Sequence, residues 1–389
     1  MGKLVSEARA EVALSADILA YFAANTEDFL KKVTIHENGT ASEVISEPLG
    51  IIFAVEPWNY PTYQVARVAG PQLMAGNVLL VKHASTVPQC ALAFAKLFED
   101  AGAPTGLYEN VFPSRPQTNL IIDDFRVHGI TLTGSDKAGA VVAERAGRKL
   151  KKVVLELGGS DPFIVLADAD LDGAIMQACG GRMLCMGQVC ASPKRFIIVG
   201  KERSQRFLGG LKQRLGSLRA GDPMDAETSI APLSSESALK TLLEQIDKAK
   251  KSGATVNLGG KRLDRPGFYL EPYLEPTIIT GISRDNPVFC EELFGPIVMV
   301  FTVDAEDEAV SLANATEFGL GSTIVTKNEP HGRDLADKID AGMVFINSCA
   351  LTISELLFGG VKNSGFGREL SGLGMAEFVN KKLVRVAPK

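Results

Sequence analysis

A chain of 389 residues that is 46% hydrophobic and 22% charged has the composition of a globular protein, and it is too long for one ordinary hydrophobic core. Its formal net charge of −5, without any basic stretch, argues against a nucleic-acid partner or an anionic membrane surface. The charged start does not resemble a signal peptide, and no apolar run is long enough to span a bilayer. The scattered cysteines favour a reduced, cytoplasmic setting.

The first part of the chain is predicted to alternate between helices and strands. Apolar residues at steps of three, four and seven predict a helix over 5–30, and Asn38-Gly39 between β-prone flanks predicts a hairpin over 33–45. The strands expected next are 50–55, 78–82, 108–112, 127–134 and 153–157, and the helices are 61–76, 88–102 and 135–147. Apolar strands separated by helices indicate a parallel sheet with crossover connections.

A second alternating region begins after Gly159. Its expected strands are 163–166, 195–199, 254–260, 296–303, 322–326 and 342–347, and the tail 381–388 is predicted to be a last strand. The fold class is therefore α/β, with two doubly wound lobes and no repeat or low-complexity linker.

The cysteines and histidines give little sign of a metal. The six cysteines form no C-x-x-C pair and the four histidines have no ligand spacing, so neither a metal site nor a disulfide framework is expected. One cysteine, Cys190, lies in the run GQVCASPKRFIIV, which indicates a loop entering a strand. Such a loop can present a nucleophilic thiol, although a small buried hydrophobic residue is the ordinary alternative.

A carboxylate, Glu156, ends the apolar strand before Gly158-Gly159. It is either a charge at a strand end or a general base with a raised pKa, and the two interpretations have equal weight. A thiol and a base together could oxidise an aldehyde, because the thiol attacks the carbonyl and base-activated water then cleaves a thioester.

Three polar loops follow expected strands of the first lobe: EPWN (56–59), KHAS (82–85) and TGSDKAG (133–139). In an open parallel sheet, ligands bind beyond the carboxyl ends of the strands. Each loop alone is more simply explained by turn chemistry, but three at successive strand ends favour a ligand site. The last loop lacks the strict G-x-G-x-x-G fingerprint of dinucleotide-binding proteins.

Seven ordered motifs carry a family resemblance: EPWNYP, KHAS, TGS, LELGGSDP, GQVC, EELFGP and FGGVKNSGFGRE. From about residue 2 to the end, the chain resembles the aldehyde dehydrogenase superfamily. LELGGSDPFIV, KRFIIV and the closing motif look most like the succinate-semialdehyde dehydrogenase branch. The resemblance implies NAD(P)-dependent oxidation of an aldehyde to an acid through a thiohemiacetal and a thioester, with succinate semialdehyde as the expected substrate.

The resemblance also implies roles for particular residues. Cys190 matches the nucleophile, Glu156 the base for deacylation, and Asn59 the oxyanion-stabilising amide. The residues expected to bind the cofactor are Trp58, Lys82, Ser85, Gly134, Ser135, Leu157, Glu292 and Phe294. Arg182 and Phe358 are the expected substrate contacts, with Arg182 either a clamp for a substrate carboxylate or a residue on a helix surface.

NADP or NAD is the implied cofactor. Relatives restricted to NAD usually place a glutamate three residues after the lysine that matches Lys82, where this chain has Ser85. A carboxylate there would repel a 2′-phosphate, whereas serine can donate a hydrogen bond to it. Ser85 therefore permits NADP without excluding NAD.

The family architecture gives the expected domains. Residues 1–32 and 49–157 would form the cofactor lobe and 158–363 the catalytic lobe. Residues 33–48 and 379–389 would form oligomerisation segments, which implies a homodimer or homotetramer.

Two departures from the family pattern keep alternatives open. Family members carry tens of further residues before the opening helix, so a truncated inactive scaffold of the same fold is one alternative. The segment 348–360 is apolar and contains Glu355, which leaves a different, less polar aldehyde as another.

Overall fold

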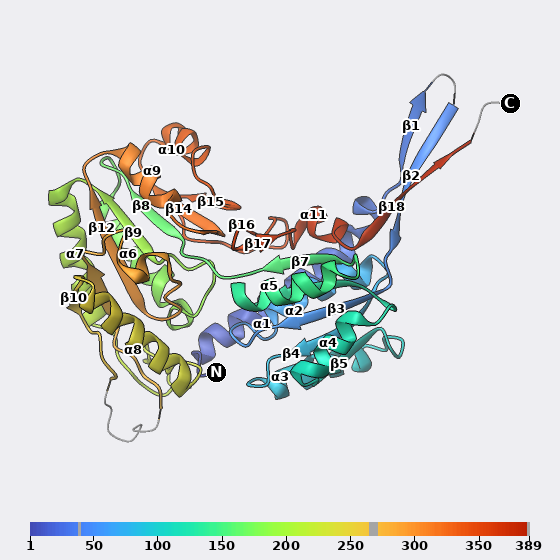
Figure 1. Ribbon diagram of the computed structural model, residues 1–389, viewed down its shortest axis with the longest axis horizontal. Coiled ribbons are helices and arrows are strands. Elements are labelled where there is room, and N and C mark those ends of the chain that lie inside the picture. Colours follow the sequence, from blue (N-terminus) through green and yellow to red (C-terminus); the bar gives the residue numbers. More distant parts are fainter. Residues whose placement is uncertain (38–39, 264–270, 387–389) are drawn as a thin grey trace. The chain divides into compact units, whose positions relative to one another are not determined.

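The computed structural model describes residues 1–37, 40–263 and 271–386 (Figure 1). The chain divides into two compact units. Unit 1 comprises Met1–Arg9, Gly158–Leu351 and Gly360–Ser364, and unit 2 comprises Ala10–Leu157, Thr352–Gly359 and Gly365–Lys389. Within the described residues, no helix is both long and apolar enough to cross a membrane.

The boundaries of these units differ in part from the expected domains. The division after Leu157 lies where the predicted cofactor lobe ends, but the first nine residues belong to unit 1 instead. They do so because they bind it: the Val5 N–H donates to the Pro223 carbonyl at 2.9 Å. The segments expected to form a separate oligomerisation part belong to unit 2.

Unit 2 contains a six-stranded sheet of order β17-β7-β6-β3-β4-β5. The strands are β3 (Ile51–Glu56), β4 (Val78–His83), β5 (Tyr108–Val111), β6 (Val127–Thr133), β7 (Lys152–Glu156) and β17 (Gly365–Phe366). The helices of this unit are α2 (Tyr63–Met74), α3 (Pro88–Asp100), α4 (Arg115–Asp123), α5 (Asp136–Gly147), α11 (Ser371–Ala376) and most of α1 (Val5–Phe29). All neighbours pair in parallel except β17, which is antiparallel to β7.

Buried apolar side chains explain why these strands and helices form. On α1, Ile18 and Phe22 are fully buried, four residues apart on one helix face. On one face of the sheet, Phe53, Ile130 and Leu155 pack with side chains of α4 and α5. The predicted parallel sheet with crossover helices is confirmed for this unit.

A second sheet in unit 2 has three antiparallel strands, β1 (Val33–Glu37), β2 (Thr40–Pro48) and β18 (Val379–Arg385). The register pairs Glu37 with Thr40, which agrees with the predicted hairpin. Its turn residues Asn38 and Gly39 lie outside the described residues. Every side chain of β1 is exposed.

Unit 1 is built on a seven-stranded sheet of order β10-β11-β12-β9-β8-β14-β15. The strands are β8 (Pro162–Val165), β9 (Arg195–Val199), β10 (Thr255–Leu258), β11 (Thr277–Thr280), β12 (Ile297–Val303), β14 (Gly321–Val325) and β15 (Met343–Ile346); β13 (Phe318–Gly319) pairs separately with β16 (Val361–Lys362). Only β10 pairs antiparallel within the seven-stranded sheet. The helices are α6 (Leu171–Met183), α7 (Lys201–Gly216), α8 (Glu236–Lys251), α9 (Glu306–Asn314) and α10 (Glu329–Ala336), with short 3₁₀ turns η1 (Leu184–Gly187) and η2 (Pro287–Cys290).

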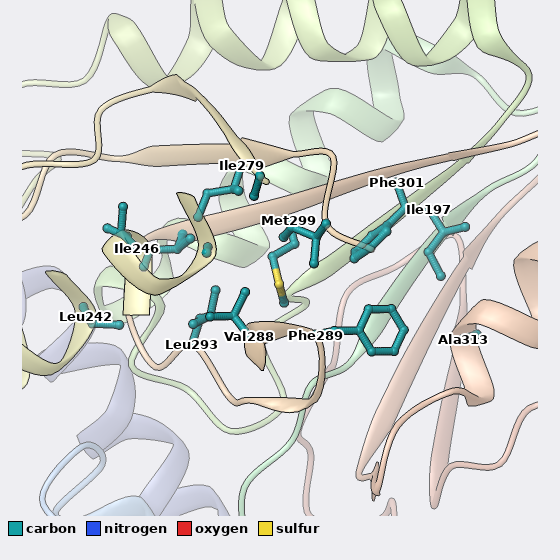
Figure 2. Close-up of a cluster of buried hydrophobic side chains, with 14 of the residues drawn as sticks. Ile197, Leu242, Ile246, Ile279, Val288, Phe289, Leu293, Met299, Phe301 and Ala313 are labelled. Atoms are coloured by element: carbon teal, nitrogen blue, oxygen red, sulfur yellow. The ribbon is translucent and has the colours of Figure 1, made fainter. Parts of the chain in front are cut away.

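Strand alternation gives this sheet two apolar faces. Phe196 and Ile198 of β9 point into a core shared with α6 and α7. Ile197, between them in sequence, points to the opposite core, which includes side chains of α8, α9 and α10. Figure 2 shows this second core, where Leu293 and Val288 lie near Met299 of β12. Both faces are therefore covered, as in a doubly wound sheet.

Candidate active site

The carboxyl ends of the parallel strands in unit 2 bring the three predicted loops to one edge. The register pairs Glu56 of β3 with His83 of β4, and Thr133 of β6 with Glu156 of β7. β3 lies between β4 and β6 in the sheet. The loops EPWN, KHAS and TGSDKAG therefore follow three adjacent strands, with Glu156 ending a fourth.

Asn59 is held in a defined orientation inside unit 2. Its side chain is buried, and its Oδ1 accepts a hydrogen bond from Gln64 Nε2 at 3.0 Å. Because an amide accepts only through oxygen, this contact directs Asn59 Nδ2 to the other side as a donor. A fixed amide donor is the group that oxyanion stabilisation requires. Trp58, beside it, is half-buried.

Two cations influence one another at the KHAS loop: Lys82, which begins the loop, and Arg115. Burial and the nearby charge of Arg115 lower the pKa of Lys82, whose side chain is half-buried. Ser85 is exposed. Arg115, which was not among the predicted site residues, is the first residue of α4 and follows β5 after a short loop. A cation just past the carboxyl end of a strand next to β4 was the signal that could have identified it.

The TGS turn leads into the N-terminus of α5. The Gly134 N–H donates to the Glu156 carbonyl at 3.0 Å, and Ser135 Oγ caps the helix by accepting from the Ala138 N–H at 3.3 Å. A helix N-terminus next to a glycine turn suits a phosphate group. Leu157 packs in the core against Gly139, so only its main chain remains for contact with a cofactor.

Three carboxylates and one arginine, which we call the acid cluster, are buried within unit 2: Glu56, Glu156, Glu369 and Arg67. Arg67 Nε forms an ion pair with Glu369 Oε2, and Thr131 Oγ1 donates to Glu369 Oε1 at 3.2 Å. Burial, and then the neighbouring charge of Glu369, raises the pKa of Glu156 and of Glu56 well above their usual range. A carboxyl of raised pKa can act as a proton acceptor near neutrality, which is the property expected of a general base.

Glu156 makes few polar contacts. Neither of its carboxylate oxygens has a hydrogen-bond partner among the described residues, although both are buried. A methyl group at Gly359 would come within 2.7 Å of Glu156 Oε1, so the glycine is needed where the two meet. An unsatisfied buried carboxylate is costly, and such groups are retained at functional sites more often than in ordinary cores.

Phe358 packs beside the acid cluster in unit 2. Its ring is buried and lies over the Arg67 guanidinium, 4.3 Å from the guanidinium carbon to the ring centroid. Its main chain forms two 2.8 Å hydrogen bonds with Glu369. The ring therefore packs against Arg67, and its role as a substrate contact stays a prediction.

Cys190 lies in unit 1, in a loop that starts from strained backbone. Cys185, Met186 and Gly187 all have positive φ angles, of 50°, 54° and 70°. Two consecutive non-glycine residues in this region are unusual and cost free energy. At Gly187 a Cβ would also lie 2.3 Å from the Gly295 carbonyl oxygen. Cys190 itself is half-buried, and the GQVC motif therefore ends a tightly constrained turn.

Polar contacts from distant parts of unit 1 hold this loop. Glu7 Oε1 accepts from the Cys185 N–H at 2.7 Å, and burial raises the pKa of Glu7 above its ordinary value even though that hydrogen bond lowers it. Gln188 accepts from the Ser234 N–H at 3.0 Å. These contacts fix the turn that precedes the thiol.

Arg182 is a structural brace, which corrects the expectation of a carboxylate clamp. Its side chain is fully buried, and its Nε donates to the Ile297 carbonyl at 2.8 Å. The remaining contacts reach Ser192 Oγ and the carbonyls of Leu293 and Gly295. A guanidinium already occupied by main-chain oxygens is not available to a substrate, and it lies inside the unit rather than on a helix surface.

Glu292 lies beside the two glycines of the LELGGSDP motif. Its Oε1 accepts from the Gly159 N–H at 3.0 Å and lies 3.2 Å from Lys194 Nζ. A Cβ at Gly158 would come within 2.4 Å of Glu292 Oε2. Phe294, two residues on, is half-buried.

The structure thus groups the expected residues within each unit. Unit 1 holds Cys190, Glu292, Phe294 and Arg182, and unit 2 holds Asn59, Glu156, Trp58, Lys82, Ser85, Gly134, Ser135, Leu157 and Phe358. Lys194 and the other members of the acid cluster around Glu156 were not predicted from the sequence. The positions of both follow from burial of charged residues, which has no local signature in a sequence.

Comparison with known proteins shows the kinship of the chain. Residues 1–384 match the aldehyde dehydrogenase family. The NADP(+) succinate-semialdehyde dehydrogenase of Deinococcus radiodurans is 46% identical over 388 residues, which cover 100% of this chain and 80% of that protein. A probable succinate-semialdehyde dehydrogenase of Synechocystis is 43% identical over 387 residues, covering 100% of this chain and 84% of that protein.

Solved structures agree with this kinship. Succinic semialdehyde dehydrogenase from Streptococcus pyogenes, in complex with NADP+, matches with a TM-score of 0.96 and 43% identity over 99% of this chain and 84% of that one. An NAD-dependent aldehyde dehydrogenase from Sinorhizobium meliloti matches with a TM-score of 0.94 and 32% identity over 99% of this chain and 76% of that one. The chain therefore belongs to the aldehyde dehydrogenase family.

Proposed function

We propose that this protein oxidises succinate semialdehyde to succinate with NADP+ as the preferred oxidant. The observation that carries the proposal is identity of 43–46% along the whole chain to relatives named for that aldehyde. The half-buried thiol of Cys190, the oriented amide of Asn59 and the raised pKa of Glu156 support the proposal. NAD+ is the alternative oxidant, because Ser85 tolerates it.

Cys190 is the proposed nucleophile, and its thiol adds to the aldehyde carbon to form a thiohemiacetal. Asn59 Nδ2 donates to the oxygen that becomes negative in this step. When bound, NADP+ would supply the acceptor for the hydride, whose loss together with a proton turns a thiohemiacetal into a thioester. Glu156 then removes a proton from water, which attacks the thioester and releases the acid.

The residues of unit 2 fit a phosphorylated dinucleotide. Gly134, Ser135 and the N-terminus of α5 offer N–H groups to a pyrophosphate. Lys82 and Arg115 offer positive charge near Ser85, whose hydroxyl can donate to a 2′-phosphate. Glu292 of unit 1 is the proposed ligand of a ribose hydroxyl.

A panel of aldehydes tests the proposal. Succinate semialdehyde, butanal and benzaldehyde are each assayed with NADP+ and with NAD+, and kcat/KM is compared. We expect the aldehyde with a distal carboxylate to give the highest value, with NADP+ favoured. A higher kcat/KM for butanal would transfer the assignment to a less polar aldehyde, and no turnover with any substrate would favour an inactive scaffold.

We also propose that the protein forms a homodimer or homotetramer through the sheet β1-β2-β18. Val33 and Ile35 of β1 and Leu383 of β18 are at least half exposed, which is unusual for large apolar side chains on one small sheet. Light scattering coupled to size-exclusion chromatography measures the mass directly. A monomer of 41.5 kDa at micromolar concentration would contradict this assembly.

A further inference from the structure

Lys194 has a buried ammonium group that contacts the peptide of the proposed nucleophile. It is the residue before β9, and its side chain has no solvent exposure. Nζ donates to the Cys190 carbonyl at 2.6 Å and to the Val189 carbonyl at 3.0 Å. It also lies 3.2 Å from Glu292 Oε1. These three acceptors match the three N–H donors of an ammonium.

The same contacts involve both glycines of the LELGGSDP motif. The Gly159 N–H bonds the carboxylate oxygen of Glu292 that faces Lys194, and a Cβ at Gly159 would lie 3.0 Å from the Cys190 carbonyl oxygen. Glu292 Oε2 lies against Gly158. Lys194 is thus a buried cation that contacts both the peptide of Cys190 and the Glu292 carboxylate, and the two glycines lie against these groups.

The chain around Glu292 is anchored separately, so Lys194 is left to orient the carboxylate itself. Leu293 is fully buried in the core shown in Figure 2. Gln245 Nε2 of α8 donates to the Glu292 carbonyl at 3.3 Å. The main chain is held by these contacts, whereas the direction of the side chain depends on Lys194 and the Gly159 N–H.

We propose that Lys194 is a positioning residue that orients the nucleophile's peptide and the ribose-binding carboxylate at the same time. The proposal rests on the proposed function for the roles of Cys190 and Glu292. Without the ammonium, the Cys190 carbonyl would lose its donor and the Glu292 carboxylate its countercharge. The carboxylate would then turn toward water, and the thiol would lose a positive charge close to its own backbone.

Arg195 supplies a matched control at the next position. Its side chain is also fully buried, and its guanidinium binds the carbonyls of Ser160, Leu312 and Ala313. Those contacts tie β9 to α9 and to the segment before β8. Arg195→Met therefore removes a buried cation of the same unit without removing a bond to the Cys190 carbonyl or to Glu292.

The test is a double-mutant cycle of Lys194→Met and Glu292→Gln in the full chain, with Lys194→Gln as a second neutral variant if the methionine variant does not fold. The first readout is the Kd for NADP+ by isothermal titration. The second is the rate at which iodoacetamide alkylates Cys190 at constant pH, followed by mass spectrometry of its peptide. Neither readout requires turnover.

We expect Lys194→Met to raise the Kd about 10-fold in the native background and less than about 2-fold when Glu292→Gln is already present, because both changes disrupt one interaction. Alkylation of Cys190 should slow about 5-fold, because the peptide that presents the thiol loses the ammonium that holds its carbonyl. Arg195→Met should leave the effect of Glu292→Gln on the Kd unchanged.

Equal effects of Lys194→Met on the Kd in both backgrounds, or an unchanged alkylation rate, would overturn the proposal. The proposal would also be overturned if Arg195→Met changed the effect of Glu292→Gln on the Kd as much as Lys194→Met does. If the unaltered protein neither binds NADP+ nor oxidises aldehydes, the proposed function fails, and the alkylation rate still reports whether Lys194 positions Cys190.

Discussion

Arg67 and Glu369 form an ion pair from which solvent is almost excluded, with side chains 1% and 6% exposed. The pair lies in the acid cluster, so one guanidinium faces carboxylates from three separate parts of the chain. Burial raises the pKa of Glu369, while the charge of Arg67 lowers it. The arginine therefore determines how much negative charge this part of unit 2 can hold.

Removing that cation should destabilise the fold. Arg67→Met is expected to lower the free energy of unfolding by about 3–5 kcal/mol, because it leaves buried carboxylates without a countercharge. Urea denaturation followed by circular dichroism measures the change. The double variant Arg67→Met/Glu369→Gln should recover part of the loss, and a double variant as unstable as the sum of the two single variants would argue against a direct coupling.

The role of Glu156 can be separated from hydride transfer. Glu156→Gln should preserve the initial burst of NADPH and reduce the steady rate by at least about 100-fold, because only the second step needs a base. Rapid mixing with absorbance at 340 nm separates the two phases. Glu56→Gln is the matched control, since Glu56 is buried in the same cluster and also has a raised pKa. An unchanged steady rate in Glu156→Gln would remove this residue from the mechanism.

Asp161 should make the stability of the protein depend on pH. Burial is the main cause that raises its pKa to about 7, from 3.8. The folded protein therefore binds a proton at the Asp161 carboxyl more tightly than the unfolded chain does. The contribution of this proton to the free energy of unfolding is fully present below about pH 4 and is lost as the pH rises through about 7. Asp161→Asn should accordingly gain stability relative to the parent protein between pH 4 and pH 8, by up to about 4 kcal/mol.

A second aspartate of unit 1 provides a control of opposite sign. Asp168 is largely exposed; burial would raise its pKa, but hydrogen bonds from Thr326 and from the N–H groups of Lys327 and Asn328 lower it overall. Its contribution is present above the unfolded pKa and is lost as the pH falls. Relative to the parent protein, the urea midpoint of Asp168→Asn should therefore show a loss that is constant between pH 4 and pH 8 and that shrinks as the pH falls below about 4, from the ordinary value of 3.8. A difference for Asp168→Asn that instead varied between pH 4 and pH 8 in parallel with that of Asp161→Asn would contradict these assignments.

Ser85 should influence the choice between the two cofactors. Ser85→Glu places a carboxylate where a 2′-phosphate would bind, so kcat/KM for NADP+ should fall at least about 10-fold while that for NAD+ falls less or rises. Ser85→Ala removes only the hydroxyl and should have a smaller effect. Initial-rate kinetics with both cofactors decide the outcome; equal losses for NADP+ and NAD+ would mean that position 85 does not contact the 2′-phosphate.

Most of the fold could be predicted because its strands are continuous apolar runs. The runs 50–55, 78–82 and 195–199 each correspond to an observed parallel strand, since a strand covered on both faces needs apolar side chains throughout. Strand β11 was not predicted, because TIIT is too short to show periodicity. The antiparallel pairing of β10 also depends on its position at the sheet edge, which composition does not encode.

The site was harder to predict than the fold, because burial decides what a charged residue does. Arg182 has the sequence context of a helix-surface or ligand-binding residue, yet four protein oxygens occupy its guanidinium. Glu369 lies in a recognised motif, but its partner Arg67 is 302 positions earlier in the chain (369 minus 67), so no local pattern connects them. Long-range pairs of this kind become visible only in three dimensions.

The adjacent glycines 158 and 159 touch different chemical groups. A single methyl at residue 158 would press on the Glu292 carboxylate, whereas one at residue 159 would press on the Asp161 side chain and on the Cys190 carbonyl. Alanine at each position therefore adds one carbon atom against a different group. Gly158→Ala would disturb the Glu292 carboxylate, which is the proposed ribose ligand, and Gly159→Ala would disturb the backbone of Cys190. Neighbouring residues in the sequence would thus report separately on two distinct parts of the chemistry.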